Sequence, residues 1–100
     1  MSLRREIERL AHDYKRKGGK KNRRKQFKRM IALGELAESM GCKHVGELGK
    51  RHVIEFWKSH RDLSESVQYQ HWLAFRELWQ RIGKAGEPPK PRIIEKNDPS

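Results

Sequence analysis

Ten lysines and arginines fall within the segment KRKGGKKNRRKQFKR, which spans positions 15–29 and contains no acidic residue. Cations at this density neutralise phosphate groups, and the release of counterions then drives binding to a polyanion. Residues 1–30 hold thirteen Lys/Arg and three Asp/Glu, whereas residues 31–100 hold eleven and ten. The excess positive charge is therefore confined to one segment, as expected of a protein that binds nucleic acid.

Helical periodicity indicates that a fold holds part of this segment. If Asn22 is the N-cap of a helix that ends near Met40, then Phe27, Met30 and Ala37 share one apolar side. The opposite side carries Arg24, Lys25, Lys28 and Arg29. We expect these cations, together with Lys20, Lys21 and Arg23, to contact phosphate. The alternative is a solvated basic tag with no partner.

Other kinds of chemistry find little support in the residue spacing. Three histidines are spaced eight apart, without the paired cysteines of zinc sites: His44, His52 and His60. His71 falls on an apolar helix side and is expected to be half-buried and hydrogen-bonded. Gly18-Gly19 lacks the strand and the lysine of a phosphate-binding loop. We expect no enzyme activity, no metal, no cofactor and no small-molecule substrate.

The remaining pattern predicts an all-α bundle of four or five helices. A first helix covers about residues 2–17 and ends at the two glycines, and the basic helix described above is the second. A third helix covers Lys50–His60. A fourth covers Glu65–Ile82 and is capped by Asp62 or Ser64. Helical spacing places four aromatic residues in the core rather than on a base-stacking surface: Trp57, Trp72, Phe75 and Trp79. We expect a basic N-terminal helix and hinge at 1–20, a helical domain at 21–84 and a flexible, proline-containing tail at 85–100.

Composition limits the class of protein further. With 34% hydrophobic residues in 100, the chain can bury one modest core. The single Cys42 forms no internal disulfide, and no stretch approaches the roughly 20 apolar residues of a membrane span. We therefore expect a cytoplasmic protein without a membrane partner, which lies on the nucleoid when it is bound to DNA.

Two stretches, together with the basic helix start, carry a resemblance to a known family. LGKRHVIEFW at positions 48–57 and LSESVQYQHWLAFR at positions 63–76 resemble the N-terminal core-binding domain of tyrosine recombinases, in its SAM-like phage-integrase form. The similar part covers about residues 21–84. In that family the domain is a small helical bundle that clamps duplex DNA, with the starts of two helices in the major groove.

The resemblance implies a set of DNA-contacting positions at two helix starts. On the second helix they are Asn22, Arg23, Arg24 and Lys25. On the fourth helix they are Ser64, Ser66, Tyr69, Gln70 and Arg76. The sequence departs from the family at Val67 and at Gly49, where threonines are common, and it lacks the catalytic Arg, Lys, His-x-x-Arg and Tyr set of the recombinases.

These observations predict a non-catalytic protein that grips duplex DNA through a basic helix face and helix N-termini. The resemblance implies that it regulates or accompanies a mobile element. Two alternatives stay open at this point: a basic RNA-binding or ribosome-associated protein, and a helical protein-interaction module.

Overall fold

The computed structural model describes residues 3–12 and 20–91, with side chains from Arg23 onward in the second range. Within these ranges the chain forms four α-helices, one short 3-10 turn and no strand, so the expected all-α fold is confirmed. In chain order they are α1 (Leu3–Leu10), α3 (Lys20–Ser39), η1 (Val45–Glu47), α4 (Lys50–Ser59) and α5 (Glu65–Ile82). None of these helices is both long and apolar enough to cross a bilayer.

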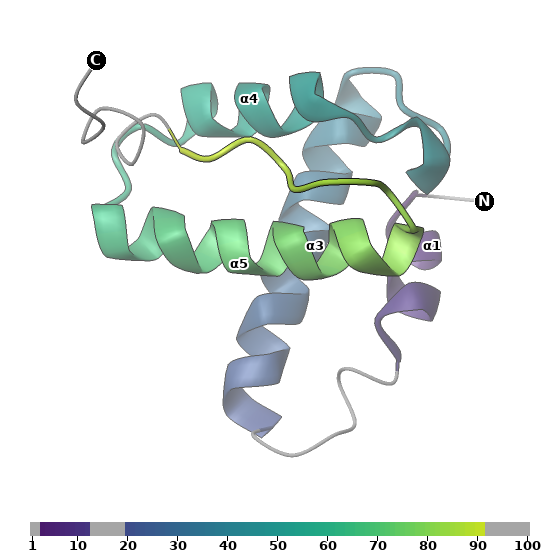
Figure 1. Cartoon of the computed structure of the whole chain (residues 1–100), viewed down its shortest axis with the longest axis horizontal. Helices are drawn as coiled ribbons and strands as arrows, with labels where there is room; N and C mark the ends of the chain where they lie inside the picture. The colour runs from purple at the N-terminus through teal and green to yellow at the C-terminus, as the bar shows by residue number, and fades with distance from the viewer. Residues whose placement is uncertain (1–2, 13–19, 92–100) are drawn as a thin grey trace.

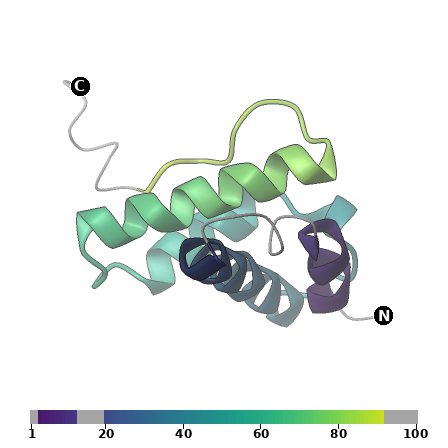
Figure 2. The ribbon, with the colours of Figure 1, turned by 90° about the horizontal axis from the view of Figure 1, so that it is seen from below.

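The long helix α3 is the central element of the bundle (Figure 1). It crosses behind α5 and packs most extensively against α5 and α1. Its first turns extend below α5, on the side away from α4, and they point toward the viewer in Figure 2. The N-terminal end of α3 therefore stands clear of the layer formed by α4 and α5.

The aromatic residues of α4 and α5 form the centre of the core. Phe56 and Phe75 meet edge to face with ring centroids 5.0 Å apart, and Trp57 lies 5.3 Å from Phe75. Trp72 and Trp79 are buried as well. Since all four residues expected in the core are buried, the prediction of core packing is confirmed for Trp57, Trp72, Phe75 and Trp79.

The ends of α5 follow the sequence prediction. The Ser64 hydroxyl oxygen accepts a hydrogen bond from the Val67 N–H at 3.2 Å, so Ser64 rather than Asp62 is the N-cap. Gly83 ends the helix with a φ of 88°, in the left-handed region that glycine adopts without a side-chain clash. The predicted bounds Glu65–Ile82 are confirmed.

The start of α3 differs from the prediction. The helix begins at Lys20, so Asn22 lies in its first turn and the assignment of Asn22 as N-cap is wrong. Lysine is a better helix former than asparagine, and the two lysines extend the helix beyond the expected cap. Helix α1 ends at Leu10, and residues 13–17 of the expected first helix lie outside the described ranges.

Helix α1 shares the core of the bundle. Leu3, Ile7 and Ala11 are fully buried, and the Leu3 N–H donates to a Glu38 carboxylate oxygen at 3.1 Å. The close approach of α1 and α3 needs a glycine, because a Cβ at Gly34 would overlap the Ile7 side chain. We expected residues 1–20 to be a unit apart from 21–84, but the described residues 3–11 are part of the same packed body.

Residues 84–91 form an extended segment, which we call the C-terminal strap, that runs back along α5 (Figure 1). The Trp72 indole N–H donates to the Pro88 carbonyl and the Trp57 indole N–H donates to the Pro89 carbonyl, both at 3.0 Å. Pro91 is fully buried. The strap thus packs on α4 and α5, which differs from the flexible tail expected from residue 85; residues 92–100 of that tail lie outside the described ranges.

Candidate nucleic-acid interface

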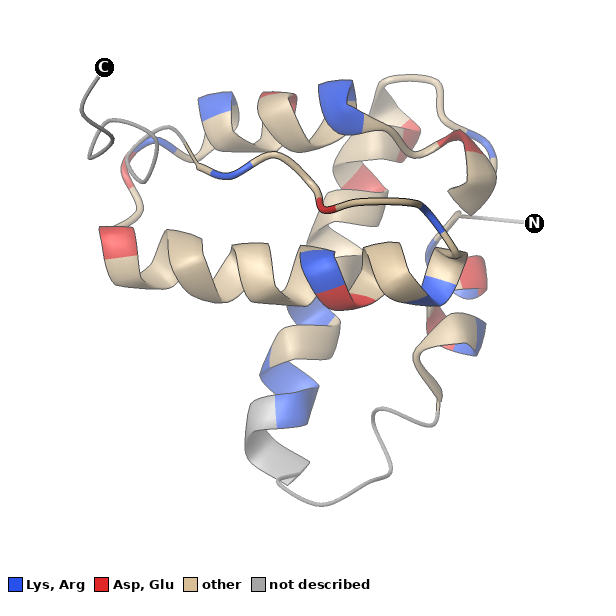
Figure 3. Ribbon diagram, in the orientation of Figure 1, with Lys and Arg blue, Asp and Glu red and all other residues tan. Residues whose placement is uncertain are grey.

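Four of the predicted cations at the start of α3 form one exposed surface. Arg24, Lys25 and Lys28 are exposed, and Arg29 is half-buried on the same side; we call these four residues the α3 basic face. Figure 3 shows them as the blue turns on the projecting part of α3. Arg23 is half-buried as well, but it lies four residues before Phe27 and seven before Met30, on the side that packs against the core. The side chains of Lys20, Lys21 and Asn22 lie outside the described part of the chain.

The opposite side of these turns fixes the basic face in place. Met30 is fully buried, Gln26 is buried, and Phe27 packs against the core. The Arg29 guanidinium donates a hydrogen bond to the Gln26 side-chain oxygen at 2.7 Å. The cations are therefore presented by a packed helix, as the periodicity predicted for Arg24, Lys25, Lys28 and Arg29.

The three exposed cations of the basic face are not balanced by nearby acids in the described part of the chain. The first turn of α3 contains no acidic residue. Among the described residues, no ion pair engages Arg24, Lys25 or Lys28. Arg24 and Lys28 lie four residues apart on α3, where like charges repel and disfavour the helix by a few tenths of a kcal/mol. A bound anion would relieve this repulsion.

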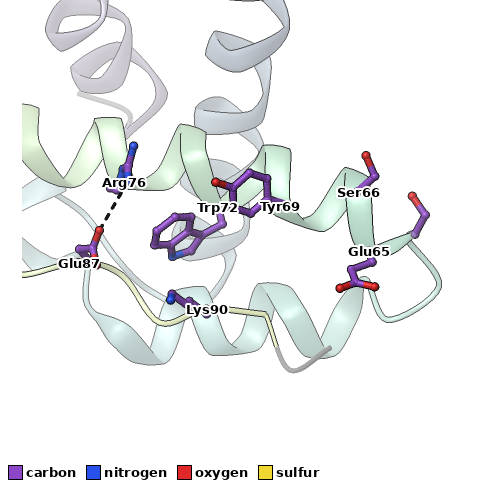
Figure 4. Close-up of a pocket in the computed structure, with 8 residues that line it drawn as sticks. Glu65, Ser66, Tyr69, Trp72, Arg76, Glu87 and Lys90 are labelled. Carbon is purple, nitrogen blue, oxygen red and sulfur yellow. Dashed lines mark ion pairs between the residues drawn. The ribbon is translucent and has the colours of Figure 1, made fainter. Parts of the chain in front are cut away.

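A groove along the first half of α5 holds most of the other predicted residues. It has a volume of about 960 Å³ and lies between α5 and the C-terminal strap (Figure 4). We call it the α5–strap groove, and its lining residues are Ser64, Glu65, Ser66, Tyr69, Trp72, Arg76, Glu87 and Lys90. Of the predicted contacts on α5, it brings together Ser64, Ser66, Tyr69 and Arg76, whereas Gln70 is half-buried and does not line it.

Aromatic rings and charged groups meet on the wall of this groove. The Tyr69 and Trp72 rings stack with centroids 5.9 Å apart and an interplanar angle of 26°. The Arg76 guanidinium lies 5.1 Å, and the Lys90 ammonium 5.6 Å, from the centroid of Trp72. Glu87 pairs with Arg76 at 3.7 Å. The groove is therefore close to charge-balanced, in contrast to the α3 basic face.

Four residues of the groove were not identified as site residues from the sequence: Glu65, Trp72, Glu87 and Lys90. Trp72 was assigned to the core, where most of its surface does lie. Glu87 and Lys90 belong to the proline-containing segment that was expected to be a tail. Its prolines favour an extended backbone, but no feature of the sequence pairs that segment with two particular tryptophans.

The buried histidines have structural partners. The Nδ1 of His71 contacts the Val67 carbonyl at 2.9 Å, and burial lowers the pKa of His71, so the predicted half-buried, hydrogen-bonded role is confirmed. The Gly49 N–H donates to Nδ1 of the fully buried His52 at 2.9 Å, and burial also lowers the pKa of His52. His52 thereby caps α4, where Gly49 itself has no side chain to do so.

Metal and thiol chemistry gain no support from the geometry. The described residues contain no group of three His, Cys, Asp or Glu side chains placed to hold a metal ion. Cys42 is buried and donates to the His44 carbonyl at 3.2 Å, and burial raises the pKa of its thiol. A raised pKa keeps the sulfur protonated and weakly nucleophilic.

Comparison with protein-family models, with curated proteins and with solved structures found no match. The resemblance to integrase core-binding domains therefore remains an expectation from the sequence.

Proposed function

We propose that this protein binds duplex DNA without catalysis, and that the α3 basic face is its grip on the phosphate backbone. The observation that carries the proposal is the combination of exposed Arg24, Lys25 and Lys28 with a first turn of α3 that contains no acid. Helix N-termini favour anions, and clustered cations on a packed surface release counterions when they meet phosphate.

The shape of the bundle supports this assignment. Because the first turns of α3 extend below α5, a long rod-like polyanion can approach them without meeting α4 or the strap (Figure 1). Phosphate contacts position a protein on DNA and carry no sequence information by themselves. Gln70, half-buried near the start of α5, remains a candidate for base readout in this proposal. From the resemblance to integrase core-binding domains we further propose that the protein regulates or accompanies a mobile element.

The test is the salt dependence of binding to a fluorescent blunt DNA duplex, measured by anisotropy with the full chain. About five phosphate contacts give a log-log slope between about −4 and −5. The triple variant Arg24→Ala, Lys25→Ala, Lys28→Ala should flatten the slope by about three units, since each lost contact removes about 0.9. A parent slope near zero would refute the proposal.

A matched control separates the α3 basic face from total charge. The triple variant Lys43→Ala, Lys50→Ala, Lys58→Ala removes the same charge from exposed positions outside α3. It should weaken binding far less and leave the slope close to that of the parent. Competition with an A-form RNA duplex of equal length then decides between DNA and RNA, because dsRNA is recognised largely by its shape. Tighter binding of RNA would favour the alternative, a basic RNA-binding protein.

A further inference from the structure

The α5–strap groove contains an exposed aromatic ring that the grip on duplex DNA does not use. Tyr69 is 45% exposed, whereas its stacking partner Trp72 is 5% exposed. Among the described residues, the exposed large hydrophobic side chains are Met40, Ile54 and Tyr69, and Tyr69 is the aromatic one. Accessible aromatic side chains are the surfaces on which proteins stack unpaired bases, and Trp72 holds this ring in place.

Two cations are fixed beside this ring by different elements. Arg76 lies two helical turns beyond Tyr69 on α5, and Lys90 comes from the strap. Both sit over Trp72, at 5.1 Å and 5.6 Å from its centroid. The strap cannot swing freely, because the Trp57 and Trp72 indoles hold its backbone. A ligand that placed a flat ring on Tyr69 would bring a neighbouring anionic group toward these cations.

The charge balance of the groove limits its anionic contact to a single phosphate group. Glu65 and Glu87 offset Arg76 and Lys90, so the groove lacks the cation excess that a duplex backbone requires. Arg76 forms an ion pair with Glu87 at 3.7 Å, between side chains that are 41% and 54% exposed. Exposed pairs of this kind contribute little and exchange readily. A single phosphate can therefore replace the Glu87 carboxylate on Arg76.

We infer that the α5–strap groove binds an unpaired nucleotide, with the base stacked on Tyr69 and the phosphate between Lys90 and Arg76. The volume of about 960 Å³ accommodates such a unit. The ligand chemistry is the same in single-stranded DNA, single-stranded RNA and a free nucleotide. This site goes beyond the grip on duplex DNA and does not depend on it, since the two surfaces share no residue.

The test uses the full chain and fluorescent oligothymidylate of about ten nucleotides, with oligouridylate and thymidine monophosphate as competitors. Tyr69→Ala should weaken oligothymidylate binding roughly tenfold or more, the loss expected for one stacked base. Tyr69→Phe keeps the ring and should bind about tenfold more tightly than Tyr69→Ala. Competition by the monophosphate would define a free-nucleotide site, whereas competition by the oligomers alone would define a strand-binding site.

Two charge variants test the phosphate position against matched controls. Lys90→Ala should weaken oligothymidylate binding several-fold, whereas Lys50→Ala, an exposed lysine at the start of α4, should not. Glu87→Gln frees Arg76 and should tighten binding about two- to fourfold. Glu35→Gln is its control, because Glu35 pairs with Arg4 at 4.0 Å with similar exposure, 59% and 57%, outside the groove.

The decisive comparison repeats these titrations in the Arg24→Ala, Lys25→Ala, Lys28→Ala background. If the groove is a separate site, the tenfold effect of Tyr69→Ala persists there, even though duplex binding has been lost. Absence of any Tyr69 effect in that background, with unchanged far-UV circular dichroism, would overturn the inference while leaving the duplex proposal intact. If the parent did not bind duplex DNA but Tyr69→Ala still weakened oligothymidylate binding, the duplex proposal would be overturned and the inference about the groove would stand.

Discussion

The α3 basic face and the α5–strap groove differ in construction, and we therefore propose a different anionic ligand for each. The basic face is built from one continuous stretch of helix, and its exposed cations meet no acid in the first turn. The groove joins residues 64–76 to residues 87–90, and it balances two cations against two acids around an aromatic pair. The first arrangement favours a long, highly charged partner, and the second favours a small one with a flat ring.

The largest expected effect tests what the two surfaces share, which is the packing of α5. Phe75 is fully buried and meets Phe56 edge to face. Phe75→Ala should lower the free energy of unfolding by about 3–5 kcal/mol, measured by urea denaturation. Both binding activities should fall together as the protein unfolds. A variant that keeps the parent's stability would show that the aromatic cluster is not the centre of the core.

Releasing the strap should separate the two surfaces. Trp57→Phe keeps an aromatic ring in the core but removes the indole N–H that donates to the Pro89 carbonyl. We expect a loss of stability of about 1–2 kcal/mol in a thermal melt, because a partly buried acceptor is left unpaired. Oligothymidylate binding should weaken as Lys90 loses its fixed position, whereas duplex binding by α3 should persist. Equal losses of both would contradict the division between the surfaces.

Acid should weaken the scaffold through His52. Its Nδ1 accepts the Gly49 N–H, and burial lowers its folded-state pKa below 6.5, so the unfolded chain binds the proton more readily. The stability that depends on the neutral ring is present above pH 6.5 and is lost as the pH falls toward the folded-state pKa. His52→Gln keeps an acceptor that does not titrate. The pH dependence of its unfolding free energy below pH 6.5 should be shallower than that of the parent, by at most about 1.4 kcal/mol per pH unit.

The smallest expected effect is a change in the pKa of His71, which lies near Arg29 of the basic face. After desolvation, the positive charge of Arg29 helps to lower the pKa of His71. Arg29→Gln should therefore raise the pKa of His71 in an NMR titration of the ring protons. The pKa of His52 should not move, because Arg29 has no part in its shift. A change at both histidines would indicate a general rearrangement instead of a local loss of charge.

The two surfaces also differ in how far the sequence alone predicts them. The helices of the bundle and the α3 basic face follow from local periodicity, because the apolar and the charged residues alternate within one helix, as with Met30 and Lys28. The groove depends on contacts between distant segments. Tyr69 and Arg76 could be placed on one helical side, but their partners Glu87 and Lys90 become neighbours only when two indoles bind the proline carbonyls.

The start of α3 was predicted wrongly for a local reason. Asn22 has the residue type of a cap, yet the helix begins at Lys20. Capping preference is worth about 1 kcal/mol, so the neighbouring residues can override it. The packing of α1 was not apparent from the sequence either, because it depends on the close contact between Ile7 and Gly34, which lie on different helices.

We propose that charge drives binding at the α3 basic face and that stacking drives binding in the α5–strap groove. The most direct test is the salt slope of binding to a DNA duplex with a single-stranded overhang, measured for the parent, Tyr69→Ala and the Arg24→Ala, Lys25→Ala, Lys28→Ala variant. Tyr69→Ala should weaken binding roughly tenfold and leave the slope unchanged, whereas the triple variant should flatten the slope by about three units. A slope that flattens with Tyr69→Ala, or one that survives the triple variant, would contradict the account.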